Sequence, residues 1–123
     1  MSLGRSIAAV MGGYLTFSLS AVALFRATGQ APHAPAPPLF MICAACYGMI
    51  FAGVGGWLAA RLCPGRPVLH GSVLALLIGV GATLAILYSG AAATWSQWEA
   101  LLLMAPMAAV GALIRSRQPR ARA

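Results

Sequence analysis

Charged residues are what this sequence has least of. Only 7% of its 123 residues are charged, and Glu99 is the single acidic residue. Soluble domains carry about 25% charged residues. With 61% hydrophobic residues and a mean hydropathy of +0.87, the chain instead has the composition of an integral membrane protein. The shortage of charge therefore excludes a soluble globular domain.

Lysine is absent, and all eight basic residues are arginines, which give a net charge of +7. In a soluble protein this balance would indicate a nucleic-acid partner. Here the arginines lie at the ends of apolar segments, without the interleaved aromatic residues of a nucleic-acid surface. We therefore expect no nucleic acid, and expect the lipid bilayer, with its anionic headgroups at the inner face, as the partner.

Potential metal ligands are equally few. Cys43, Cys46 and Cys63 are too few, and too deep in apolar segments, for a disulfide framework. His33 and His70 fall on opposite sides of the membrane in the topology described below, so they cannot complete one tetrahedral zinc site. We predict no metal site and no cofactor.

Apolar runs fill most of the chain, and each is long enough to cross a bilayer, which takes about 20 residues. The sequence predicts an all-α fold, an integral membrane bundle of four transmembrane helices, with residues 1–123 as a single membrane domain. The expected helices cover residues 6–26, 39–62, 67–89 and 97–115, and a basic tail covers residues 116–123.

The arginines are divided unequally between the two ends of these helices. Arg26 stands alone at one end, and the other seven gather at the opposite end. Cytoplasmic loops carry the excess of basic residues, so both termini are predicted to lie inside. Trp95 and Trp98 would then lie at the outer interface, where aromatic belts occur.

Small residues recur every four positions along the second and third apolar segments. Such ridges let helix backbones approach closely in lipid. A turn containing Pro64 and Gly65, with the composition of a type II turn, joins the two segments. We predict that residues 40–88 form a closely packed hairpin through the helix-packing residues Ala44, Gly48, Ala52, Gly56, Ala60, Gly71, Ala75 and Gly79.

The fourth segment carries three further signals. Pro106 lies inside it and predicts a kink. Ser96 and Glu99 have the S-x-x-E spacing of a capping box at its start. Glu99 and Arg26 lie at one depth on the outer side, so an interfacial polar pair between them is the alternative role for the acid.

Cys43 and Cys46 form a C-x-x-C motif at the outer end of the second segment. With four helices and both termini inside, the chain resembles the DsbB family of quinone-linked thiol oxidases. That resemblance implies a redox role for Cys43 and Cys46. It covers topology and this one motif, because residues 89–97 lack the second cysteine pair of that family. The alternative is that both are inert, small hydrophobic residues.

The segment from Gly55 to Arg61, followed by Arg66-Pro67 and His70-Gly71, resembles a pattern in small uncharacterised bacterial four-helix membrane proteins. This resemblance implies a multi-pass protein of the bacterial inner membrane. It implies no substrate and no catalytic residue.

Three functions follow as hypotheses. The first is a structural or accessory membrane protein without enzymatic activity, which packs with itself as a homo-oligomer or within a larger membrane complex. The second is the thiol–quinone redox protein. The third is a small transporter or channel, which would need an embedded ionisable group in a polar cavity.

Overall fold

The computed structural model describes residues 2–120, which form helices joined by short connections and contain no strand. Four helical stretches are long and apolar enough to cross a membrane, and this confirms the predicted all-α, four-span fold. Of the predicted basic tail, residues 121–123 lie outside the described residues. The elements are α1 (Leu3–Thr28), α2 (Pro38–Leu62), α3 (Pro67–Tyr88), and a continuous fourth helix made of α4 (Trp95–Glu99), the π-helical segment η1 (Ala100–Met104) and α5 (Ala105–Arg117).

Local sequence explains where the first three helices begin and end. The Ser2 hydroxyl accepts a hydrogen bond from the Arg5 amide and caps the start of α1. Gly29 ends that helix with a φ of 72°, a left-handed conformation that glycine adopts without a steric penalty. Pro38 and Pro67 occupy the first turns of α2 and α3, where a missing amide costs nothing.

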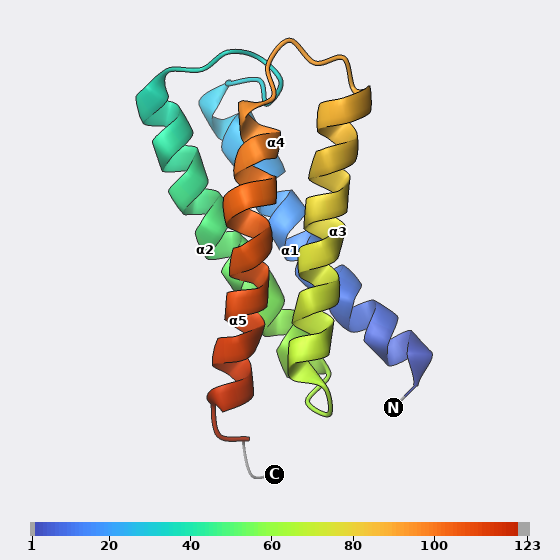
Figure 1. The fold of residues 1–123 in the computed structure, drawn as a ribbon. Helices are drawn as coiled ribbons and strands as arrows, with labels where there is room; N and C mark the ends of the chain where they lie inside the picture. Colours follow the sequence, from blue (N-terminus) through green and yellow to red (C-terminus); the bar gives the residue numbers. More distant parts are fainter. Residues whose placement is uncertain (1, 121–123) are drawn as a thin grey trace.

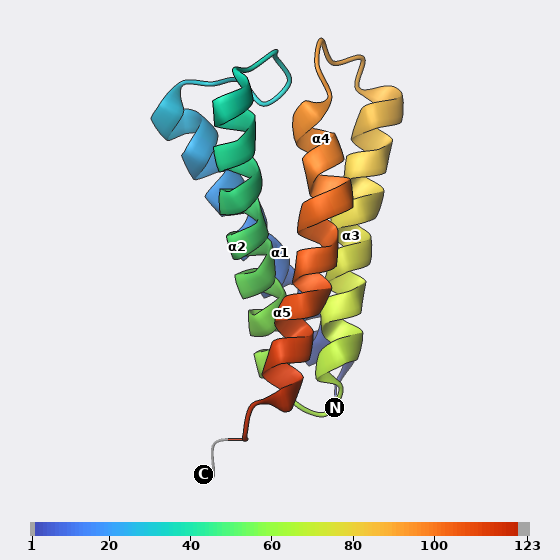
Figure 2. The same ribbon diagram turned by 60° about the vertical axis from the view of Figure 1, so that its left-hand side comes forward.

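The two ends of the bundle differ in what they carry. Both termini and the α2–α3 turn lie at one end, and the α1–α2 and α3–α4 connections lie at the other (Figures 1 and 2). We call these the arginine-rich end and the loop end. Among the described arginines, Arg26 alone belongs to the loop end, and the arginine-rich end holds Arg5, Arg61, Arg66, Arg115, Arg117 and Arg120.

The fourth helix runs between α2 and α3 (Figure 2). The helices α2 and α3 also contact each other, as the predicted hairpin requires. The predicted packing of one small-residue ridge on the other was wrong, because Gly56 and Gly71 face the fourth helix instead. A Cβ atom added to Gly56 of α2 would overlap the backbone carbonyl of Ala108, and one added to Gly71 of α3 would overlap the Ala112 side chain. The reason is that α5 has small residues of its own and can approach both neighbours closely.

The predicted helix-packing residues are mostly enclosed within the chain. In α2, Gly48 faces the Met104 side chain of the fourth helix. Gly79 of α3 has looser neighbours, with Leu101 and Ala105 at 3.6 and 3.8 Å from an added Cβ. Six of the eight are buried (Ala44, Gly48, Ala52, Gly56, Ala60 and Gly71), whereas Ala75 and Gly79 are half-buried.

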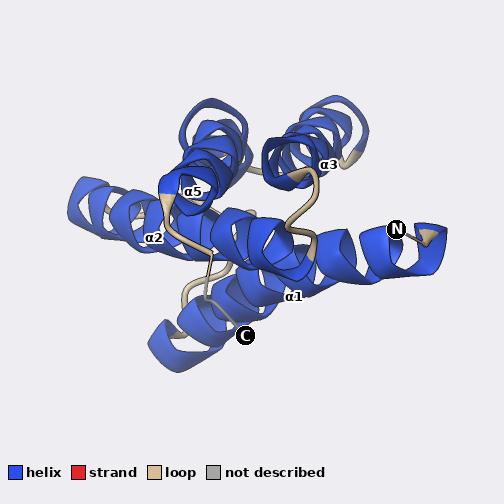
Figure 3. Ribbon diagram, turned by 90° about the horizontal axis from the view of Figure 1, so that it is seen from below, coloured by secondary structure: helices blue, strands red, loops and turns tan. Residues whose placement is uncertain are grey.

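A second close approach joins α1 to α2. A Cβ on Gly13 would come within 2.5 Å of the Gly55 carbonyl oxygen, and one on Gly55 within 2.6 Å of the Gly13 oxygen. The fully buried side chain of Leu74 packs against this crossing from α3. The crossing lets α1 run obliquely across the other helices, so that its N-terminal half extends beyond α3 (Figures 1 and 3).

One local prediction needs correction. The α2–α3 turn is closed by a hydrogen bond from the Arg66 amide to the Cys63 carbonyl, 3.3 Å long. Gly65 has no positive φ, so the predicted type II turn was wrong. In the fourth helix, the Ala105 amide bonds to the Ala100 carbonyl five residues back, immediately before Pro106. The helix thus accommodates the proline, which lacks an amide, with a π-helical segment.

Candidate functional site

A cavity of about 210 Å³ lies in the loop-end half of the bundle, between α1, α2, α3 and the start of the fourth helix. Aromatic side chains from three of these helices supply much of its wall. They are Tyr14, Phe17 and Phe25 of α1, Tyr47 of α2 and Trp95 of α4. Four polar residues also reach it, namely Ser20, Ser96, Gln97 and Glu99. The cavity is therefore an apolar, π-rich space with polar groups at a few points.

The polar groups contributed by α1 and α2 are already hydrogen-bonded. Tyr47 donates its hydroxyl to the Ser20 carbonyl at 2.8 Å, and the Ser20 hydroxyl donates to the Phe17 carbonyl at 2.6 Å. The Tyr47 ring packs against Phe51, with ring centroids 4.7 Å apart. These contacts hold the tyrosine ring in one orientation at the cavity wall.

Gln97 places an unpartnered acceptor in the same region. Its side chain is only 8% exposed, and its amide nitrogen lies 2.5 Å from Nδ1 of His33 in the α1–α2 loop. Because an amide nitrogen only donates, Nδ1 of this histidine is the acceptor. The amide oxygen Oε1 is buried and has no hydrogen-bond partner among the described residues. Buried polar atoms are nearly always paired, so this oxygen is an exception that calls for an explanation.

Glu99 supplies the second such acceptor. Its Oε2 atom is buried and finds no hydrogen-bond partner in residues 2–120. The predicted polar pair is not brought together, because Arg26 is exposed at the end of α1 and makes no bond to this carboxyl. Instead, the only acidic side chain of the protein lines the cavity.

The α1–α2 loop fixes the start of the fourth helix. The Trp95 indole donates to the Ala34 carbonyl at 2.8 Å, and the Ser96 hydroxyl donates to the Pro32 carbonyl at 2.7 Å. The predicted capping box was therefore wrong: Thr94 is the N-cap, and Ser96 lies inside the helix and bonds to the loop. We call these two bonds, together with the bond from the Ala93 amide to the His33 carbonyl at 3.1 Å, the loop clamp.

An aromatic cluster extends this arrangement across the loop end. Phe25, Phe40 and Trp95 come from α1, α2 and α4, and their ring centroids lie 5.9 to 6.2 Å apart. Such tilted and edge-on pairs are favourable beyond the area they bury. The cluster and the loop clamp together position the helix turn that carries Gln97 and Glu99.

The cysteines do not contribute to this cavity. Cys43 and Cys46 are exposed on the outer side of α2, away from the other helices, and Cys63 is buried beside the Arg5 carbonyl. The outward placement follows from the ridge, because Ala44 and Gly48 turn the opposite side of α2 inward. All three thiols are free, and no group of three metal-ligating residues occurs in the described part of the chain.

Sequence reasoning had singled out Glu99 but not Phe17, Tyr47 or Gln97. Each of these is one aromatic or amide side chain in an apolar segment, and spacing along the chain does not reveal that they meet. Comparisons with protein-family models, curated proteins and solved structures find no match to this chain. The chemistry of the cavity must therefore carry any functional conclusion.

Proposed function

We propose that this is a small multi-pass membrane protein that binds a small organic cation in the loop-end cavity. The observation that carries the proposal is the pair of unpartnered acceptors, Oε1 of Gln97 and Oε2 of Glu99, which line one aromatic cavity. An embedded ionisable residue in a membrane protein usually marks a path or site for an ion or a substrate.

Both the acidic side chain and the aromatic side chains that line the cavity favour a cation over a neutral or anionic ligand. A carboxylate with one buried oxygen and no partner for it is costly, and a positive charge beside it offsets that cost. Aromatic faces such as those of Tyr14, Phe17 and Tyr47 attract ammonium groups through their ring quadrupoles. None of the described arginines lines the cavity to compete for the acid.

The volume limits the size of the ligand. An apolar cavity of about 150 Å³ accommodates benzene. A cavity of about 210 Å³ therefore suits a quaternary ammonium of the size of choline, or a benzylammonium. Larger multi-ring cations would require the aromatic cluster to move.

For location, we propose the bacterial inner membrane, with the arginine-rich end in the cytoplasm and the loop end outside. The unequal division of arginines supports this orientation. The cation site would then be supplied from the outer side, next to the α1–α2 loop.

A structural or accessory role is the second proposal. Small-residue ridges are typical of helices that pack closely with partners, although Gly48, Gly56 and Gly71 already pack against the fourth helix of the same chain. The observation that favours this role is a less tightly packed face of α3, which lines an open groove beside the fourth helix at Ala75, Gly79 and Thr83. A redox role for Cys43 and Cys46 stays a hypothesis that their exposure makes easy to test.

Tryptophan fluorescence tests the cation site. Trp95 lines the cavity, whereas Trp57 lies at the arginine-rich end and Trp98 is exposed. In a Trp57→Phe, Trp98→Phe background, titration of the detergent-solubilised protein with choline should change Trp95 emission to saturation. The uncharged carbon analogue of choline, with a tert-butyl group in place of the trimethylammonium, should bind far more weakly.

Two variants decide the outcome. Glu99→Gln should lose the response, and Ser18→Ala, which removes a hydroxyl of α1 outside the cavity lining, should keep it. An equal response to choline and to its uncharged analogue would contradict the cation proposal. No response to choline, choline-sized amines or benzylammonium in a protein with a normal helical spectrum would mean that the cavity holds only water.

A further inference from the structure

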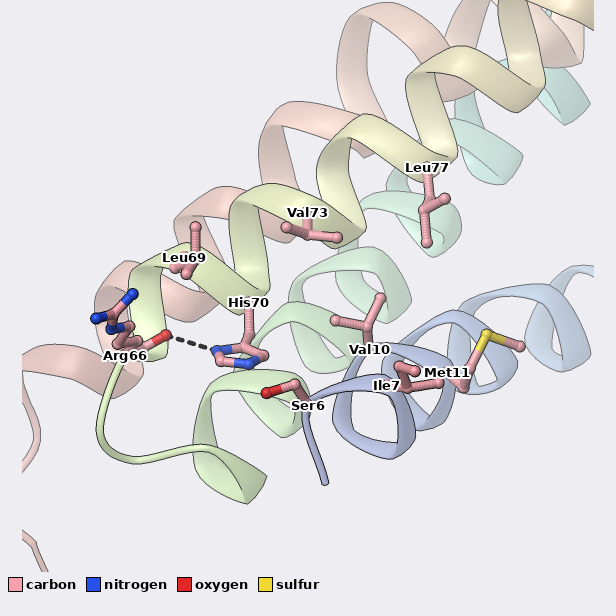
Figure 4. Close-up of a pocket in the computed structure, with 9 residues that line it drawn as sticks. All are labelled: Ser6, Ile7, Val10, Met11, Arg66, Leu69, His70, Val73 and Leu77. Atoms are coloured by element: carbon pink, nitrogen blue, oxygen red, sulfur yellow. Dashed lines mark hydrogen bonds between the residues drawn. The ribbon is translucent and has the colours of Figure 1, made fainter. Parts of the chain in front are cut away.

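A second hollow lies toward the arginine-rich end, between the N-terminal half of α1 and the first turns of α3. It has a volume of about 670 Å³ and is open along one side, because α1 runs obliquely away from the bundle (Figures 1 and 3). Its walls are apolar, with Ile7, Val10 and Met11 on α1 and Leu69, Val73 and Leu77 on α3 (Figure 4). We call it the α1–α3 groove.

One end of the groove is polar. Ser6 of α1, His70 of α3 and Arg66, the residue before α3, line that end. The Arg66 carbonyl faces the His70 ring, and its guanidinium points away from Ser6 (Figure 4). His70 is only 5% exposed, and its Nδ1 lies 2.7 Å from the Arg66 carbonyl. Because a carbonyl only accepts, Nδ1 carries the proton, and Nε2 has no hydrogen bond to another described residue. Nε2 is not among the enclosed, unpartnered atoms of the described residues, so it is open to a polar group in the groove. It is an acceptor in the neutral ring and a donor in the protonated ring.

Positive charge accompanies this polar end. The Arg66 guanidinium is exposed and makes no hydrogen bond to another described residue. It lies at the N-terminus of α3, which has no side-chain cap and therefore leaves backbone amides free in its first turn. Such a terminus favours negative charge, and the arginine adds to that preference.

We infer that the α1–α3 groove binds one anionic phospholipid. Its phosphate lies at Arg66, beside His70 and Ser6, and one acyl chain follows the apolar wall from Leu69 toward Leu77. The positive charge of the polar end and the uncapped start of α3 match the phosphate of such a lipid, and the apolar wall matches an acyl chain. From His70 to Leu77 the wall is about 10 Å long at the helical rise of 1.5 Å per residue. The inference is independent of the proposed cation site.

Native mass spectrometry of the full chain, released from detergent with added lipid, tests the inference. With dioleoyl phosphatidylglycerol we expect one lipid to remain bound per protein, and with phosphatidylcholine none at the same concentration. Arg66→Gln should weaken phosphatidylglycerol retention about tenfold, as expected for loss of a charged hydrogen bond.

Arg61→Gln is the matched control, because Arg61 lies at the same end of the bundle but stacks over the Trp57 ring at 5.2 Å, outside the groove. It should leave retention unchanged. Val73→Trp keeps every charge and should abolish retention, because the indole fills the space along the apolar wall. Thermal unfolding of each variant in detergent separates a lost site from a lost fold.

Three results would overturn the inference. They are equal retention of phosphatidylcholine and phosphatidylglycerol, equal losses in Arg61→Gln and Arg66→Gln, and unchanged retention in Val73→Trp. Glycerophosphoglycerol, the headgroup without acyl chains, should not compete at concentrations that match the lipid. Competition by this headgroup would show an anion site on Arg66 without a role for the groove.

Discussion

At the scale of single residues, glycines decide how closely the helices approach. Gly56 and Ala108 lie so close that any side chain on Gly56 would overlap the facing backbone. In lipid this close contact matters because apolar burial gains little against the lipid tails. The sequence did identify Gly56 as a packing residue, since its four-residue spacing is visible without a structure.

The first prediction concerns Gly56. Gly56→Leu should force α2 and α5 apart and lower the free energy of unfolding by about 1–3 kcal/mol, the usual cost of overpacking. Thermal unfolding in detergent, followed by circular dichroism, measures it. Gly81→Ala is the control, because an added Cβ there meets nothing within 4 Å. It should be neutral or stabilising, since alanine is the better helix former. Equal melting temperatures for Gly56→Leu and wild type would contradict the close contact.

The second prediction concerns the stability of the ligand-free site. Glu99 holds a buried carboxyl oxygen without a partner, which costs about 1–3 kcal/mol in typical proteins. Glu99→Gln removes the charge and should raise the melting temperature of the ligand-free protein, although it removes cation binding. Such an exchange of stability for function is common at binding sites. A lower melting temperature of Glu99→Gln would show that the carboxylate stabilises the fold and already has a partner.

At the scale of helices, periodicity predicted which faces are buried but not which helices meet. The ridges of α2 and α3 and the short turn between them suggested one hairpin interface. However, Met104, Ala108 and Ala112 repeat the same spacing in the fourth helix. Three similar ridges allow several pairings, and only three-dimensional packing selects the one in which α5 packs against the ridges of both α2 and α3.

The cavity could not be predicted from the sequence, for a related reason. Its acceptors depend on the loop clamp, in which residues 32–34 bond to the first turn of α4. A proline-rich loop indicates an extended segment but not the surface it lies on. The S-x-x-E pattern also predicted a helix cap at Ser96. In the structure the Ser96 hydroxyl bonds to the Pro32 carbonyl of the loop instead, and Thr94 is the N-cap.

The third prediction tests the loop clamp. Trp95→Phe with Ser96→Ala removes both of its side-chain hydrogen bonds but keeps an aromatic ring in the cluster. Hydrogen exchange at the Ala93 amide, which bonds to the His33 carbonyl, should become at least about tenfold faster. Ser89→Ala, at the end of α3 outside the clamp, should leave that amide unchanged. Unchanged exchange in the double variant would show that the two side chains do not hold the loop.

At the scale of the whole molecule, the chain has both termini and the α2–α3 turn at one end. The fourth prediction is that this end faces the cytoplasm. A reporter that works only in the cytoplasm should be active when fused after Ala123 and inactive when inserted beside Ala34 in the α1–α2 loop. Arginine placement is the physical reason. Activity at the loop insertion would reverse the orientation and place the cation site on the cytoplasmic side.

The proposed function depends on a charge-dependent ligand site in the loop-end cavity. Calorimetric titration with benzylammonium and with uncharged benzyl alcohol, each against wild type and Glu99→Gln, tests it most directly. The two compounds fill similar space and differ in charge, so the four affinities form a cycle that isolates the interaction of the cation with the acid. We predict a coupling of about 1.4 kcal/mol or more, a tenfold preference for the cation that disappears in Glu99→Gln. Additive effects, with the same preference in both proteins, would contradict the site.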